Sequence, residues 1–249
     1  MRRRLPTPVG WLLAVVVAAG FSALGSWQLG RAQAKRALLD QVAQVLRARQ
    51  PRPLSAAAQH DRAQQLDWAA GRGHFAPGPA VLLDNQSHDG QPGVRAYRPF
   101  VPDDGGPALL VDLGWQPLDA ARTMPVVPPL TGSRQIAGLL APPPAPGLIR
   151  GMPAVQEDGD LLAVALEPAV LAAPLGRKRL APRVLRLDPA LPIGFARDLD
   201  VLPNTLPPAR HLGYAVQWFG LALAVLVTAV VLTWRRRGAT REKMGHDPA

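Results

Sequence analysis

The pattern of hydrophobic positions predicts one long apolar helix near each end of the chain. Residues 9–29 read VGWLLAVVVAAGFSALGSWQL, and residues 214–234 read YAVQWFGLALAVLVTAVVLTW. Each stretch has 21 residues and contains no Asp, Glu, Lys or Arg. About 20 apolar residues in a helix cross the hydrocarbon core of a bilayer. We therefore expect two transmembrane helices, with residues 30–213 between them as one domain and residues 1–8 and 235–249 as terminal tails.

Between the two apolar stretches, the pattern changes from helical to strand-like. Residues 31–50 space their apolar side chains for one helix face, so this segment continues the first helix until Pro51 and Pro53. A short helix is expected at residues 167–173, with Pro168 in its first turn. The remaining pattern consists of short apolar segments separated by Gly, Pro and Asp turns, which predicts a mostly antiparallel β domain with a few helices and an α+β membrane protein overall. The predicted strands are residues 66–75, 80–84, 93–101, 108–114, 134–140 and 183–188.

The distribution of charge predicts how the chain crosses the membrane. Its net charge is +10, and the two tails hold eight basic and two acidic residues, so they carry six of those ten charges. Cytoplasmic flanks are enriched in Lys and Arg, which predicts that both termini are cytoplasmic and that the β domain is periplasmic, in a bacterial inner (plasma) membrane. A cleaved signal peptide is the competing interpretation of the first stretch, and its unusual apolar length disfavours it. The β domain has no basic run interleaved with aromatics, so we expect no nucleic-acid partner.

The residue types available for chemistry argue against an enzyme. The chain has no cysteine, which excludes thiolate catalysis and iron–sulfur clusters. His60, His74 and His88 of the predicted β domain do not have the spacing of metal ligands, and no H-E-x-x-H or G-x-S-x-G sequence occurs. Of the three hypotheses that we consider for the function, a membrane-anchored periplasmic enzyme is therefore the least favoured. The other two, an assembly factor and a scaffold, are described below.

Five segments follow one another along nearly the whole chain: GSWQLGR at 25–31, LDNQ at 83–86, LVDLGWQP at 110–117, GLL at 138–140 before three prolines, and HLGYAVQWF at 211–219. Together they resemble the surfeit locus protein 1 family, the Shy-type cytochrome c oxidase assembly factors. This resemblance implies a non-enzymatic factor in respiratory-chain biogenesis that helps to insert haem a, bound transiently as a cofactor, into a haem–copper oxidase. Its expected partners are the catalytic subunit of that oxidase, the lipid bilayer and, as a further candidate, haem a synthase.

The residues at the start of the second apolar stretch give this hypothesis a candidate site. Haem iron accepts His, Met, Cys or Tyr side chains, and at this interface only His211 and Tyr214 offer such atoms. Both share one helix face with Trp218, and the helix N-terminus disfavours a protonated imidazole. We predict His211 as the iron ligand and cofactor contact, with Tyr214 beside it. Arg31 and Arg210 are the expected partners of the haem propionates.

Each of these residues also has a structural interpretation. His and Tyr at a membrane interface can act as amphipathic anchors. Gln28 and Gln217 lie near the outer ends of the two stretches, where we expect interhelical hydrogen bonding rather than ligand contact. Trp115 is expected to pack in the core. The corresponding functional alternative is a membrane scaffold that holds oxidase subunits in place and binds no cofactor.

Overall fold

The computed structural model describes residues 6–147, 151–199, 201 and 206–244, and the side chains of these residues up to 236. The chain divides into two compact units, a helical unit of Met1–Leu38 with Leu206–Ala249 and a β unit of Leu39–Thr205. The elements are α1 (Thr7–Ala48), β1 (Pro51–Arg52), two 3₁₀ turns (Leu54–Ala58 and His60–Arg62), β2 (Asp67–Phe75), β3 (Val81–His88), β4 (Gln91–Pro102), β5 (Leu109–Pro117), β6 (Ser133–Ala141), β7 (Ala154–Val155), β8 (Leu161–Ala163), α2 (Pro168–Leu171), β9 (Val184–Leu187) and α3 (Pro208–Met244).

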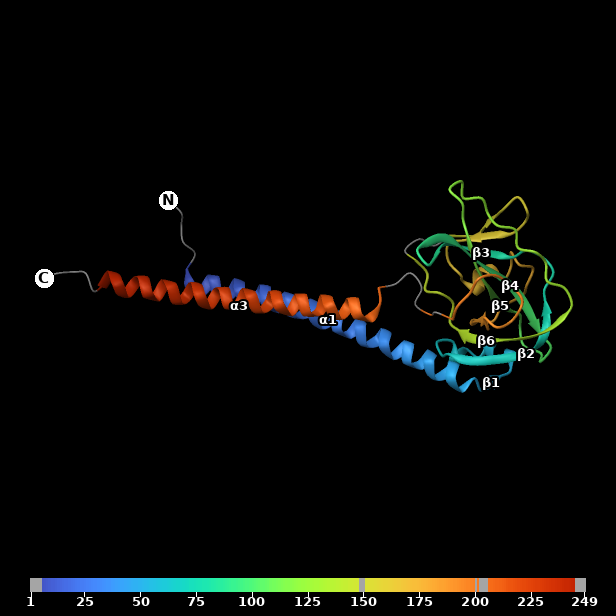
Figure 1. Ribbon diagram of the computed structural model, residues 1–249, viewed down its shortest axis with the longest axis horizontal. Coiled ribbons are helices and arrows are strands. Elements are labelled where there is room, and N and C mark those ends of the chain that lie inside the picture. The colour runs from blue at the N-terminus through green and yellow to red at the C-terminus, as the bar shows by residue number, and fades with distance from the viewer. Residues whose placement is uncertain (1–5, 148–150, 200, 202–205, 245–249) are drawn as a thin grey trace. The chain divides into compact units, whose positions relative to one another are not determined.

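The helical unit is a hairpin in which α1 and α3 lie side by side and antiparallel (Figure 1). Small residues recur every seventh position on the α1 side of the contact, at Ala18, Gly25 and Ala32, and all three are buried. Such residues let two helix backbones approach closely. At Gly25 an added Cβ would lie 2.9 Å from the ring of Phe219 on α3. We call this contact line the hairpin seam.

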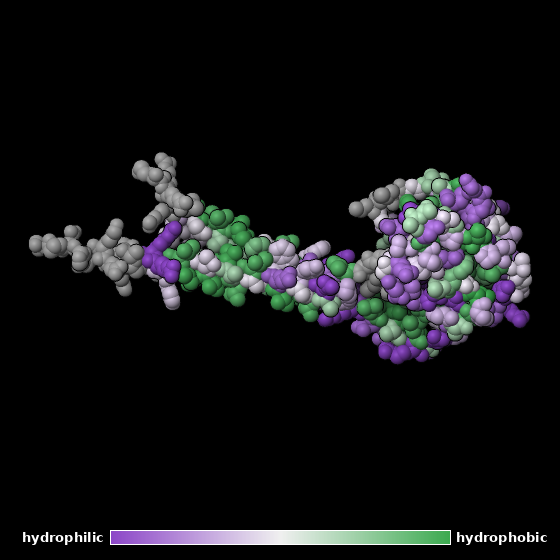
Figure 2. All heavy atoms as spheres, turned by 45° about the horizontal axis from the view of Figure 1, so that its top comes forward, coloured by the Kyte–Doolittle hydropathy of each residue, from purple (hydrophilic) through white to green (hydrophobic). Residues whose placement is uncertain are grey.

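Outside the seam, both helices expose apolar side chains. Each is long and apolar enough to cross a membrane, which confirms the two predicted apolar helices and is compatible with membrane insertion. Figure 2 shows hydrophobic residues over the visible face of the paired helices, with hydrophilic residues toward the C-terminal end of α3. At that end the indole Nε1 of Trp11 donates to Thr233 Oγ1 at 3.0 Å, so a partly buried hydrogen bond also joins the two helices there.

The β unit is built on one sheet with the strand order β1-β2-β6-β9-β5-β4-β3-β8-β7. An additional β2–β4 pairing closes β2, β6, β9, β5 and β4 into a small barrel, from which β3, β8 and β7 extend. Among the described residues the pairs β1–β2, β3–β8 and β5–β9 are parallel and all others are antiparallel, which confirms the predicted mostly antiparallel domain.

All six predicted strands are present, with ends shifted by a few residues, and the short predicted helix is α2. The expected turn between β3 and β4 is a two-residue loop in which Asp89 and Gly90 both have positive φ, at 51° and 79°. This is the backbone that a tight hairpin between right-twisted strands requires. Strands β1, β7 and β8 were not predicted, because segments of two or three residues carry no readable alternation.

Alternation along the strands divides the apolar residues of the β unit between two clusters. Inside the barrel, Phe75 and Phe100 meet edge to face with ring centroids 5.0 Å apart. On the outer surface, Tyr97 and Leu110 pack with residues of β8 and α2 in a second cluster. Trp115 is buried, as expected, and its ring lies 5.3 Å from that of His88. The β unit therefore has its own two-layered core.

Candidate functional site

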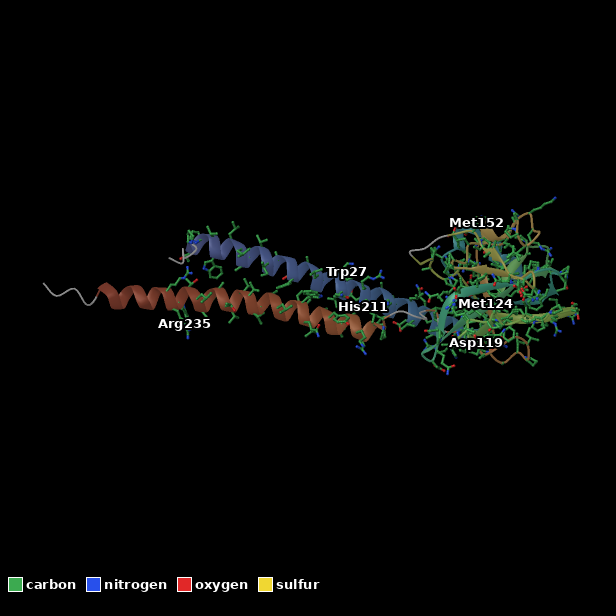
Figure 3. The ribbon with its side chains drawn as sticks, turned by 90° about the horizontal axis from the view of Figure 1, so that it is seen from above. Trp27, Asp119, Met124, Met152, His211 and Arg235 are labelled. Atoms are coloured by element: carbon green, nitrogen blue, oxygen red, sulfur yellow. The ribbon has the colours of Figure 1, made fainter. Side chains whose placement is uncertain are left out.

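The candidate site lies in the hairpin seam, at the end where α3 begins. His211 follows Pro208 by less than one helical turn, and its side chain is only 7% exposed. One turn further, Ala215 is 2% exposed, and Ala32 of α1 is fully buried beside this part of the seam. Because both alanines are small, the helices come close enough for side chains of α1 to reach the imidazole. Figure 3 shows His211 and Trp27 near the same end of the hairpin and Arg235 at the opposite end.

Gln28 of α1 is the hydrogen-bond partner of this histidine. The distance from its Oε1 to His211 Nδ1 is 2.8 Å. An amide oxygen can only accept, so Nδ1 carries the hydrogen and the lone pair of the neutral ring is on Nε2. That Nε2 is buried and has no hydrogen-bond partner among the described residues. Leaving a buried acceptor unpaired costs about 1–3 kcal/mol. This cost singles out His211 Nε2 as a candidate ligand atom of the helical unit.

This hydrogen bond corrects one expectation. An interhelical hydrogen bond is present, but Gln28 makes it with His211 and not with Gln217, whose side chain is exposed. Gln217 is six residues beyond His211, and on an α-helix that spacing turns it away from the seam. The sequence placed both glutamines near the outer ends of the two apolar stretches, and the rotation of each helix decided which one faces inward.

Basic side chains surround the imidazole on the α1 side. The charges of Arg31 and Lys35 both act on His211, and Lys35 Nζ donates to the carbonyl oxygen of Leu206 at 2.5 Å. Arg31 is exposed, as is Arg210, which precedes His211 on α3. The structure therefore places the two predicted arginines at this end of the hairpin and adds Lys35. Its position one turn after Arg31 is the signal that could have indicated it.

The aromatic residues lie at the margin of the seam. Trp218 contacts Phe21 across the two helices, with ring centroids 5.6 Å apart. Tyr214 is 37% exposed, so it lies beside the seam and not within it, although it is close to His211 in sequence. Trp27 is 59% exposed on α1. The imidazole is thus inside the helix contact, and flat apolar side chains are available at the surface next to it.

Comparison with known proteins assigns the chain to a family. The model of the SURF1 family matches residues 15–223. The chain belongs to the SURF1 family. It is also similar to uncharacterized SURF1-like proteins of Mycobacterium bovis and of two Mycobacterium tuberculosis strains, at 29% identity over 253 aligned residues that cover 96% of this chain and 89% of each relative. SURF1 proteins are cytochrome oxidase assembly factors, so a general role in assembly follows from membership.

The β unit of this SURF1 chain holds a second group of polar residues, on the outer surface of the barrel, in which Arg95 and Asp112 are buried. Arg95 and Asp112 form an ion pair at 2.8 Å, and Arg95 is 3.6 Å from Asp198. Asp198 in turn lies 3.2 Å from Nδ1 of His88. Burial by itself would lower the pKa of the Arg95 guanidinium, but the charge and hydrogen bond of Asp112 outweigh it and raise that pKa. Arg186 Nε lies 3.9 Å from Asp112, so the group contains two guanidinium groups and two carboxylates. No group of three or more metal-binding residues occurs among the described side chains.

The residues around His211 include the types of side chain that bind a haem. The buried Nε2 lone pair is an unused ligand atom, and neutral imidazole is a common ligand of haem iron. Two exposed arginines and a lysine can meet carboxylate groups, and Tyr214 and Trp27 offer flat apolar surface.

Proposed function

We propose that this SURF1-family chain helps to insert haem a into the catalytic subunit of a haem–copper terminal oxidase by holding the haem for hand-over. The observation that carries the proposal is the buried, unpaired Nε2 of His211. An assembly factor needs a site that binds its cargo and later releases it. A single imidazole in the contact between two helices meets both needs, because the iron would have one protein ligand to gain on binding and one to lose on release.

Each residue of the site has a separate part in this proposal. His211 offers Nε2 to the iron, which supplies an electrophilic centre for the imidazole lone pair when haem is bound. Arg31 and Arg210 form ion pairs with the propionates, and Lys35 adds a third positive charge near the ring. Tyr214 packs against the macrocycle. Because His211 is only 7% exposed, the side chains around Nε2 must move when the ligand enters.

The site also needs a defined place in the cell. The proposal has both termini in the cytoplasm and the β unit in the periplasm of the inner membrane, because Arg235 and Arg236 follow the second apolar stretch. His211 then lies near the outer face of the bilayer, beside the membrane-embedded catalytic subunit and within reach of haem a synthase. Cysteine labelling at residues 90 and 160 checks this topology, and labelling from the cytosol would contradict it.

The direct test is haem occupancy of a His211→Ala variant, purified in detergent from cells that make haem a. We expect the Soret absorption of the wild-type protein to be lost, with unchanged membrane insertion and yield. His60→Ala is the matched control, because it removes an exposed imidazole of the β unit and should keep its haem. Equal haem content in the His211 variant and the wild type would refute the ligand role.

The same preparation separates this proposal from the scaffold alternative. A scaffold retains oxidase subunits during purification but shows no Soret absorption in either protein. Haem bound to the wild type and absent from the His211 variant supports hand-over. Subunits retained without any haem would instead favour a scaffold.

A further inference from the structure

The hydrogen bond from His211 to Gln28 decides which ring nitrogen of His211 carries the hydrogen and which keeps its lone pair. We propose that Gln28 is a positioning residue: it holds the imidazole as the Nδ1–H tautomer, orients the ring across the seam and keeps the Nε2 lone pair available to a metal. The inference rests on the proposed function, since it concerns the same site. The observations are the 2.8 Å distance between Gln28 Oε1 and His211 Nδ1 and the buried Nε2 that has no partner among the described residues.

The physical basis is the coupling between the two nitrogens of one ring. A neutral imidazole carries one hydrogen, and an acceptor facing Nδ1 keeps it there. Metal-binding histidines commonly donate their second N–H to such an acceptor, which fixes the ring orientation and raises the basicity of the ligating nitrogen. Loss of this partner typically costs 10- to 100-fold in metal affinity. Gln28 stands in that position and comes from the opposite helix.

The chemical type of the acceptor matters as well. A carboxylate accepts a hydrogen bond more strongly than a neutral amide does. It would make Nε2 more basic and hold the iron more tightly. An amide is the weaker acceptor and suits a ligand that has to be released. The structure therefore predicts an order of affinity with the residue at position 28: Glu above Gln, and Gln above Leu.

A purely structural role for this hydrogen bond predicts something different. A polar pair in a helix contact also fixes the register of the two helices. In that case Gln28→Glu would bring no gain in affinity, and any loss in Gln28→Leu would accompany a loss of hairpin stability. Gln217→Leu is the matched control, because it removes the same residue type from an exposed position of α3.

The first measurement needs no haem. The full-length protein in detergent, labelled with ¹⁵N-histidine, reports the tautomer of His211 through the distinct shifts of protonated and unprotonated ring nitrogens. The His211→Ala spectrum identifies its signals among those of the five histidines. We expect a protonated Nδ1 in the wild type and in Gln217→Leu, and a mixture of tautomers in Gln28→Leu. A protonated Nε2 in the wild type, or an unchanged tautomer in Gln28→Leu, overturns the inference.

The second measurement titrates these proteins and Gln28→Glu with ferric haem b and follows the release of the haem to apomyoglobin. We expect Gln28→Leu to bind roughly 10- to 100-fold more weakly than the wild type, and Gln28→Glu to release haem more slowly. Affinities that are equal in all three proteins overturn the positioning role even if the tautomer changes. Binding that survives in His211→Ala defeats the proposed ligand itself, and the haem-free measurement still decides what Gln28 does to the ring.

Discussion

The buried ion pair at one end of the barrel gives the sharpest prediction about stability. Arg183 is fully buried, and its Nη1 lies 2.7 Å from Asp67 Oδ2. Replacing Asp67 by Ala leaves the guanidinium charge buried without a carboxylate. Removing one partner of such a pair typically costs about 3–5 kcal/mol. Arg183 keeps the backbone oxygens of Ala56 and Gln65 as acceptors, so we expect the lower end, about 3 kcal/mol.

This cost should be visible as a shift in melting temperature. For a domain of 150–250 residues, 1 kcal/mol corresponds to roughly 2–4 °C. The β unit, Leu39–Thr205, is in this size range, so Asp67→Ala should melt about 6–12 °C below the wild type. The assay is thermal unfolding of the full-length protein in detergent, followed by circular dichroism of the β unit.

The control is Asp61→Ala, which removes an exposed carboxylate from the neighbouring 3₁₀ turn. Exposed substitutions of this kind change stability by about 0.5 kcal/mol or less. If Asp67→Ala melts at the same temperature as Asp61→Ala, the buried charge does not need its partner and the reasoning is wrong.

Two further predictions concern the same unit. Burial would raise the pKa of Asp67, but hydrogen bonds and charges from its arginine partners outweigh that effect and lower the pKa. The ionised Asp67 therefore stabilises the folded β unit fully above about pH 4, and this contribution is lost as the pH falls through the lowered pKa. The melting difference between wild type and Asp67→Asn should accordingly narrow below pH 4, and a constant difference would contradict the assignment. Gly138→Ala would place a Cβ 2.0 Å from the carbonyl oxygen of Arg186 on β9. Overpacking of this kind costs about 1–3 kcal/mol or more, so this variant should melt several degrees lower, whereas Gly151→Ala, with open space around it, should not.

Much of the fold was readable from the sequence because its elements follow local rules. The two apolar stretches predicted α1 and α3, since a helix in lipid needs no distant partner to satisfy its backbone. The six longer strands were readable from alternation and from turns such as Asp89-Gly90. The shortest strands were not, since β7 and β8 exist only by pairing with each other and with β3.

The candidate site could be predicted only in part from the sequence, because some of its contacts join residues far apart in the chain. The sequence indicated His211 by its residue type and its place at a helix start. It could not show that Gln28, 183 positions away, is its partner, because helix rotation and approach decide that contact. Lys35 was missed as well, although its position one turn after Arg31 could have indicated it. Similarly, the sequence around Arg183 does not predict that this side chain is fully buried, because its carboxylate partner, Asp67, is 116 positions away.

The sequence by itself thus determined which segments are apolar helices, which are strands and which side chains could bind a metal, because these properties depend on residue type and short-range spacing. Only the tertiary structure decided how the barrel closes, which glutamine enters the seam and which nitrogen of His211 is left free. Those outcomes depend on distances between segments far apart in the chain, and packing sets these distances.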